Sequence, residues 1–234
     1  MTAILKRELG AYFASPIGYA VTAAFMFFSG MFFNYYCLVS GTSSMYGVFQ
    51  GMFSIILFLI PLITMRSFAE ERRNKTDQIL YTSPVSIPSV VIAKYLSAMV
   101  LLLICLSSYL IEGLVLSMFG SPDWSVIIGN ILGMLMLGSA FISINLLISS
   151  LTESVMVAAV FSFAVNYLIS LTDTVRATVN WQLLSDTLGA VSFQMRYDNF
   201  ELGIIKLSDV VFFVTVTALF LVLTDRVIEK KRWS

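Results

Sequence analysis

Residues 66–86 read RSFAEERRNKTDQILYTSPVS, and this short polar segment separates two long apolar ones. Seven charged side chains fall within residues 66–77, a quarter of the twenty-eight acidic and basic residues in the chain. Of the 234 residues, 58% are hydrophobic and 12% are charged, whereas an average soluble domain is about 25% charged. Too few charges remain to cover a water-facing surface, so the composition predicts an integral membrane protein.

Six apolar stretches are candidates for membrane-spanning helices, which need about 20 predominantly apolar residues to cross roughly 30 Å of hydrocarbon. They are residues 17–39, 48–65, 90–118, 126–149, 154–171 and 207–224. The second contains Gln50 and Pro61, and the sixth is short unless it begins near Ile204. We therefore expect an all-α integral membrane protein, a single domain over residues 1–234 with six transmembrane helices.

The basic residues predict how these helices are oriented, because Lys and Arg are retained on the cytoplasmic side of short loops. Eleven of the fourteen fall before the first span, around the second-to-third connection or after the last span; they are Lys6, Arg7, Arg66, Arg72, Arg73, Lys75, Lys94, Arg226, Lys230, Lys231 and Arg232. The other three are Arg176, Arg196 and Lys206. This distribution predicts that both termini and residues 66–86 are cytoplasmic.

Two further segments have their own predicted places. Residues 1–16 (MTAILKRELGAYFASP) favour an interfacial helix on the inner face that ends at Ser15 and Pro16. Residues 172–206 are then predicted to lie on the extracytoplasmic side. Within them Val175, Val179, Leu183 and Leu188 recur at helical spacing beside Trp181, a pattern typical of an amphipathic helix at the outer interface.

The charged segment is itself predicted to be helical. Residues 67–80 contain no Gly or Pro and are rich in good helix formers, and Pro84 and Pro88 disfavour helix just before them. A solvated loop that holds positive charge inside is the simpler interpretation. A short polar helix over residues 67–81, tethered between two spans, is better suited to receive force from a soluble partner.

TMRSFAEERRNKTDQILYTSPVS (residues 64–86), followed by AKYL, resembles the hallmark of ABC-2-type permeases, F-x-E-E-(K/R)-x-x-x-T followed by L-x-x-S-P. The resemblance is closest to the gliding-motility-associated branch of that family. Four further blocks carry it: KRELGAYFASPIGYAV, GSPDW, SSLTESVMVAAVFSF and FLVLTDRVIEKKRW. The five blocks occur in the right order and cover most of the chain.

The resemblance implies six membrane helices, an N-terminal amphipathic elbow helix (residues 1–16), a cytoplasmic coupling helix within residues 66–86, and an outer hairpin (residues 172–206) before the last helix. It also implies that the coupling helix docks on a separate ATP-binding subunit. The implied contact residues are Phe68, an apolar anchor in or near the contact, and Glu70, Glu71, Arg72, Thr76 and Leu80. Asn74 and Lys75 stand where family members often have glycine, and Gln78 stands in place of Glu.

The expected partners follow from what the chain lacks and what the family has. The sequence contains no G-x-x-x-x-G-K-[ST] motif, so we expect ATP and Mg²⁺ in a dimer of partner ABC ATPase subunits, and no enzymatic activity, cofactor or metal in this chain. A second permease subunit, identical or homologous, is expected in the bilayer, with an extracytoplasmic auxiliary subunit as an optional partner. No nucleic acid partner is expected, and the predicted location is the inner membrane of a bacterium.

Polar residues inside the predicted spans are functional candidates. Glu112 is either held by a structural partner or interface, or contacts substrate or a proton. Asn34, Gln50, Asn145 and Asn166 are interpreted as interhelical hydrogen-bonding residues. Pro61 either acts as a hinge in the second span or is passively tolerated there, with its freed carbonyl satisfied by a Ser, a Thr or a neighbouring helix.

The leading hypothesis is a permease subunit of an ATP-driven transporter that moves or exports a substrate which the sequence does not identify. One alternative is a membrane scaffold or mechanotransmitter subunit of an ABC-type envelope machine, without bulk transport. A second alternative is an ion-coupled transporter, which would need ionisable groups distributed through its spans.

Overall fold

The structure is a computed structural model that describes residues 2–76, 86–178, 189 and 192–232. Six of its helices are long and apolar enough to cross a membrane, and the described residues contain no β-strand. The spanning helices are α2 (Pro16–Phe33), which η1 (Asn34–Val39) extends as a π-helix, α3 (Tyr46–Thr64), α6 (Ile87–Ser117), α7 (Trp124–Leu151), α8 (Val155–Thr178) and α11 (Leu207–Arg232). The shorter helices are α1 (Thr2–Ala14), α4 (Ala69–Arg73) and α10 (Phe193–Glu201).

The predicted set of six apolar helices is confirmed, with differences at the helix ends. The stretch that contains α3 continues through a turn into α4, so its candidate span is Tyr46–Arg73. The last helix begins at Leu207, as predicted, but extends to Arg232 and is therefore long enough to cross a bilayer. The chain is thus a multi-pass, all-helical membrane protein.

Proline and capping residues set several helix starts. Pro16 and Pro88 lie in the first turns of α2 and α6, where the missing N–H would have no helical partner in any case. Asp123 caps α7, and its carboxylate accepts the backbone N–H of Ser125 at 3.1 Å. Ser192 caps α10 in the same way, through its hydroxyl and the backbone N–H of Met195. Residues close to each helix start therefore determine where these helices begin.

Helix α7 forms the centre of the bundle. It packs against α3, α6, α8, α10 and α11 and is the most buried of the six spans, whereas α8 and α11 are among the least buried. Gly138 shows how closely α7 approaches its neighbours, because a Cβ there would overlap the side chain of Leu102 on α6. A small residue at this crossing lets the two helices pack closely.

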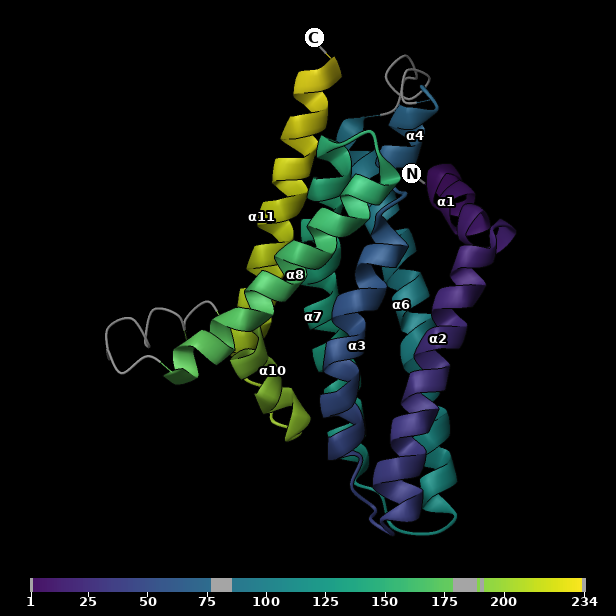
Figure 1. Ribbon diagram of the computed structural model, residues 1–234, viewed down its shortest axis with the longest axis vertical. Helices are drawn as coiled ribbons and strands as arrows, with labels where there is room; N and C mark the ends of the chain where they lie inside the picture. The colour runs from purple at the N-terminus through teal and green to yellow at the C-terminus, as the bar shows by residue number, and fades with distance from the viewer. Residues whose placement is uncertain (1, 77–85, 179–188, 190–191, 233–234) are drawn as a thin grey trace.

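Both chain ends and α4 lie at one end of the bundle, which we call the terminal end (Figure 1). The connections between η1 and α3 and between α6 and α7 lie at the other end, the distal end (Figure 1). Helix α1 packs on α2 and α6 at the terminal end. The helix predicted before Pro16 is therefore present, and its position at a membrane surface stays a prediction.

Helix α10 was not predicted from the sequence. It folds back against α7 (Figure 1), where Gly133 leaves room for Phe200, whose Cβ would lie 2.5 Å from a Cβ at that glycine. The Tyr197 hydroxyl donates to Asn130 on α7 at 3.1 Å. The amphipathic pattern that includes Trp181 falls mostly on residues 179–188, outside the described residues.

Pro61 lies inside α3, where its ring removes the N–H that would have bonded the Leu57 carbonyl. The side-chain amide of Asn166 on α8 donates to this carbonyl at 3.3 Å. A neighbouring helix therefore satisfies the freed group, as the sequence predicted, and Asn166 forms an interhelical bond.

The other three amides differ from the prediction. Asn34 and Gln50 are exposed, and their side chains form no interhelical bond among the residues that the structure describes. Asn145 is fully buried, but its amide has no hydrogen-bond partner among the described residues. A polar residue in an apolar stretch therefore did not by itself identify an interhelical bond, because the sequence does not show which way the side chain points.

Candidate functional site

One serine of α7 fixes the start of helix α4. The Ser149 hydroxyl accepts the backbone N–H groups of Phe68 and Ala69, each at 3.2 Å, and donates to the Met65 carbonyl at 3.2 Å. The first N–H groups of a helix have no partner within it, and Phe68, at the N-cap position, offers no capping side chain. Ser149 supplies the missing acceptor from another helix and so fixes the start of α4.

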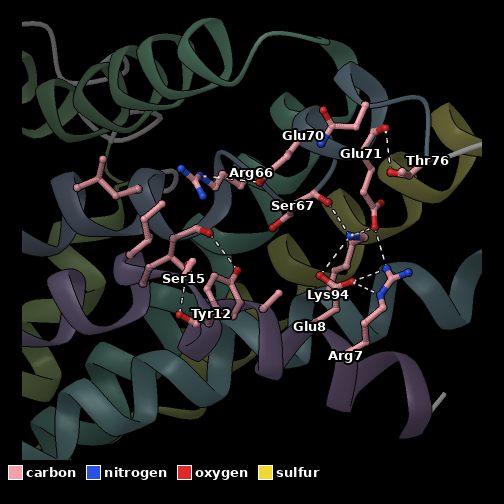
Figure 2. Close-up of a pocket in the computed structure, with 15 residues that line it drawn as sticks. Arg7, Glu8, Tyr12, Ser15, Arg66, Ser67, Glu70, Glu71, Thr76 and Lys94 are labelled. Atoms are coloured by element: carbon pink, nitrogen blue, oxygen red, sulfur yellow. Dashed lines mark hydrogen bonds and ion pairs between the residues drawn. The ribbon is translucent and has the colours of Figure 1, made fainter.

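The ammonium group of Lys94 lies at the junction of α1, α4 and α6 (Figure 2). Its side chain is 1% exposed. It lies 3.0 Å from the Glu71 carboxylate and 3.3 Å from that of Glu8, and it donates to the Ser67 carbonyl at 2.6 Å. A buried charge is tolerated only when it is paired and hydrogen bonded. The ion pairs of Lys94 with Glu8 and Glu71 therefore hold α1 and α4 against α6.

Arg7 completes this charged cluster, which we call the Lys94 cluster: Arg7, Glu8, Glu71 and Lys94. The Arg7 guanidinium lies 2.6 Å from Glu8 and 2.8 Å from Glu71. Two cations and two carboxylates therefore alternate across three helices (Figure 2). On the same helix as Arg7 and Glu8, the Tyr12 hydroxyl donates to the Ile63 carbonyl at 3.0 Å, and burial raises the pKa of Tyr12 to about 12, so this phenol remains a donor.

Arg72 ties the other side of α4 to the end of α7. Its guanidinium donates to the Ser150 carbonyl at 3.1 Å and to the Glu153 carboxylate at 2.9 Å. Lys231, near the end of α11, also donates to Ser150, at 2.6 Å. The five-residue helix is thus connected to most of the terminal end of the bundle, and displacing it would disturb several spans together.

A cavity of about 410 Å³ opens beside the Lys94 cluster, between α1 and the α3–α4 connection. Its apolar lining comes mainly from Ile17, Leu62 and Ile63, and its charged lining from the Lys94 cluster together with Arg66 and Glu70. Figure 2 shows Arg66 on the far side of Ser67 from Arg7. Within the part of the chain that the structure describes, no three His, Cys, Asp or Glu side chains gather as a metal site would require.

The predicted contact residues fall into two groups. Phe68 is 7% exposed and lies beneath Lys94, whose ammonium is 5.1 Å from the ring centroid, while Glu71 and Arg72 bond to other helices of the same chain. Glu70 is half exposed and Thr76 is exposed. Leu80 lies outside the described residues. Arg73, which was not among the predicted contacts, is exposed on α4.

The predicted helical length is not observed. A continuous helix over residues 67–81 was expected, but α4 ends at Arg73 and a turn follows at residues 74–76. Lys75 has φ = 56°, the left-handed conformation that often ends helices and that glycine adopts at least cost. The propensity argument failed because Asn74 and Lys75 end the helix although neither is a glycine.

Glu112 is buried near the distal end of α6. The Ser29 hydroxyl of α2 donates to its Oε1 atom, and its Oε2 atom has no hydrogen-bond partner among the described residues. This geometry favours the first of the two interpretations, a carboxyl held by a structural partner. The Glu112 side chain lies far along α6 from Lys94, so it does not belong to the site at the terminal end.

Sequence reasoning missed the residues that organise this site. Lys94 had been counted only as a positive charge, Glu8 had no assigned role, and Ser149 was one serine among several. The available clue was a lysine within the predicted span of residues 90–118, because a charge within a span demands a partner. Nothing in the sequence named that partner, which comes from helices far apart in the chain.

Comparison with models of known protein families identifies the family of this chain. The model of the ABC-2 family transporter proteins matches residues 31–172, more than half of the chain. The chain therefore belongs to the ABC-2 family of transporter proteins, whose members are membrane transport components and are not themselves catalytic. No curated protein matches the chain. Membership in this family implies partnership with an ABC ATPase in general terms.

Proposed function

We propose that this chain is the permease subunit of an ATP-driven transporter and that α4 is its coupling element. In this proposal the exposed face of α4 docks on a separate ATPase subunit that binds ATP and Mg²⁺. Closure of two such subunits moves α4, and α3 and α6 carry the movement to the substrate pathway. Two permease subunits, identical or homologous, meet in the membrane.

The observation that carries the proposal is the two-sided character of α4. One side is committed to the bundle: Glu71 to α1 and α6, Arg72 to α7, and the helix start to Ser149. The other side presents exposed Arg73, and the turn that follows α4 presents Asn74 and Thr76, which are also exposed. A helix that is bonded to the bundle on one side and exposed on the other can contact a partner subunit and transmit its movement to the membrane-spanning helices.

The proposed orientation puts the terminal end in the cytoplasm of a bacterial cell, with the chain in the inner membrane. Support comes from the basic residues that gather there on α1, α4 and α11, including Lys6, Arg73 and Lys230, since Lys and Arg are retained on the cytoplasmic side. The residues before Pro16 then form the interfacial elbow helix, and α10 belongs to the extracytoplasmic hairpin.

The gliding-motility branch, with its extracytoplasmic auxiliary subunit, rests on the five sequence blocks and stays a prediction. The mechanotransmitter alternative would use the same contacts of α4 with the bundle and with the ATPase subunit. It differs from the transporter only in that no substrate crosses the membrane. The ion-coupled alternative loses support from Glu112, because Ser29 holds that carboxyl inside the bundle.

The structure sharpens the choice of variants that test coupling. Glu71→Lys and Phe68→Asp would break contacts inside the chain, so their effects would mix misfolding with loss of docking. Arg73→Glu changes an exposed side chain of α4 and leaves these contacts in place. Arg226→Glu is the matched control, since Arg226 is a 73%-exposed cation on α11.

The measurement is co-purification of the ATPase subunit and ATPase activity in reconstituted vesicles. Arg73→Glu should weaken ATPase association about tenfold, the equivalent of one charge-assisted hydrogen bond, while the permease still inserts. Arg226→Glu should leave both unchanged. Normal association and coupled activity of Arg73→Glu would contradict docking at α4, and ATP-dependent accumulation in vesicles separates transport from mechanotransmission.

A further inference from the structure

The cavity beside the Lys94 cluster has a charge pattern that the coupling proposal does not use. Its lining includes three cations and three carboxylates. Four of these six groups make up the Lys94 cluster and pair with one another at 2.6–3.3 Å. The other two are Arg66 and Glu70, which approach each other only to 3.9 Å and are 44% and 45% exposed. Among the described lining residues, this one cation and one anion are loosely paired.

The lower lining of the same cavity is apolar and belongs to the membrane-spanning helices. Ile17 lies in the first turn of α2, and Leu62 and Ile63 lie in the last turn of α3. Both positions are at the level where these spans end. A ligand that fills the cavity therefore meets a polar region beside α4 and an apolar region beside the spans, which is the pattern of an amphiphile at a membrane surface.

We propose that this cavity binds one phospholipid with a zwitterionic headgroup that carries a primary ammonium. Arg66 donates to the phosphate oxygens, for which the planar guanidinium is well suited. Glu70 accepts hydrogen bonds from the ammonium, and the first carbons of the acyl chains lie against Ile17 and Leu62. The volume of about 410 Å³ falls within the usual range of small-ligand pockets, about 300–1,000 Å³.

The charge balance separates this ligand from two other membrane lipids. An anionic headgroup suits a basic pocket, but here three carboxylates offset the three cations. A trimethylammonium headgroup is zwitterionic but has no N–H to donate to Glu70. A side chain of the ATPase subunit is disfavoured by the apolar lower lining, which a soluble protein would have to cover with apolar groups at the membrane surface.

The test is native mass spectrometry of the purified, delipidated full chain, titrated with three phospholipids that share the same acyl chains. Their headgroups are phosphoethanolamine, phosphocholine and phosphoglycerol. The phosphoethanolamine lipid should bind about tenfold more tightly than either of the others, the equivalent of one charge-assisted hydrogen bond. Equal binding of all three, or tightest binding of the phosphoglycerol lipid, would overturn the proposal.

Substitutions then test the proposed contacts of Glu70 with the ammonium and of Arg66 with the phosphate. Glu70→Gln should abolish the preference over the phosphocholine lipid, and Arg66→Gln should weaken binding of both zwitterionic lipids about tenfold. Arg73→Gln, an exposed α4 cation that does not line the cavity, should change neither. Circular dichroism and thermal unfolding check that both variants fold, since each side chain is half exposed. A preference for the phosphoethanolamine lipid retained in Glu70→Gln would refute the Glu70 contact, and unchanged affinity for both zwitterionic lipids in Arg66→Gln would refute the Arg66 contact.

Two further arms distinguish the source of the headgroup. Free phosphoethanolamine at the same concentration should not compete with the lipid; full competition would show that the acyl chains are not used and would overturn a lipid site. Addition of the ATPase subunit should leave the bound lipid in place. Displacement of the lipid by that subunit would assign the cavity to the protein partner instead.

Discussion

At the scale of single residues, Lys94 is the most consequential side chain of the terminal end. It is the buried member of a cluster whose other cation, Arg7, is half exposed. Removing it leaves Glu8 and Glu71 facing each other with only Arg7 between them. The cluster therefore depends on a residue that reaches it from inside a membrane-spanning helix.

We expect Lys94→Met to lower the free energy of unfolding by about 3 kcal/mol, because it leaves two partly buried carboxylates with Arg7 as their remaining ion-pair partner. Lys75→Met is the matched control: Lys75 is exposed and forms no ion pair with any residue that the structure describes. Thermal unfolding of the detergent-solubilised protein measures both. If the two variants lose the same stability, the Lys94 cluster does not hold the helices together.

A second residue-scale prediction concerns pH and Glu201 of α10. Burial, with a contribution from the nearby charge of Asp198, raises the pKa of Glu201 from its ordinary 4.5 to about 7. The folded chain therefore binds this proton more tightly than the unfolded chain. The stabilisation is complete below about pH 4.5 and is lost as the pH rises through about 7.

Thermal unfolding as a function of pH tests this linkage. Glu201→Gln removes the titrating group and should flatten the fall in stability between about pH 4.5 and 7. Glu229→Gln is a suitable control, since Glu229 pairs with Arg226 on the surface of α11. A Glu201→Gln profile that falls as steeply as that of the wild type would show that another group titrates in this window.

At the scale of helices, the contact between Pro61 and Asn166 joins α3 to α8. The proline leaves the Leu57 carbonyl without its helical donor, and Asn166 supplies one from the neighbouring helix. This bond satisfies the freed carbonyl whether Pro61 acts as a hinge or is passively tolerated. Whether α3 bends at this point during coupling stays a prediction.

A double-mutant cycle tests the bond. Asn166→Leu should cost about 1 kcal/mol of stability in the wild-type background. In the Pro61→Ala background the restored N–H bonds the Leu57 carbonyl, so the same change should cost much less. Thermal unfolding of all four proteins gives the coupling energy. Equal costs in both backgrounds would contradict a specific pairing of Asn166 with the freed carbonyl.

Secondary structure was predictable where local physics decides it. Long apolar runs can satisfy their backbone groups in a membrane only as helices, and prolines and capping residues mark their starts. The prediction failed at α4, where helix-forming residues such as Arg72 are followed by the left-handed Lys75. It missed α10 because residues 193–201 are not strongly apolar, and their burial depends on Gly133 of a distant helix.

At the scale of the whole molecule, the candidate site combines α1, α3, α4, α6 and α7, elements separated by up to about half of the sequence. The position of α4 between two spans could be predicted from charge and from family resemblance. The Lys94 cluster could not, because its ion pairs depend on how α1 folds back onto α6. Tertiary packing selects among many equally plausible charge pairs.

The exposed apolar faces of α8 and α11 also belong to this scale. Both are among the least buried spans, with large side chains such as Phe161 and Val214 exposed. In a single chain these faces contact lipid, and a second permease subunit would cover part of this surface.

The most direct test of the central claim is the side of the membrane on which α4 lies. A cysteine replaces exposed Asn74 in one variant and exposed Ser43, at the distal end, in another; the native Cys37 and Cys105 are buried and should contribute little background. A membrane-impermeant maleimide added to intact cells should label the Ser43 variant and spare the Asn74 variant, which should react only in inside-out vesicles. Labelling of the Asn74 variant in intact cells would place α4 outside, beyond the reach of any cytoplasmic ATPase, and would contradict the account.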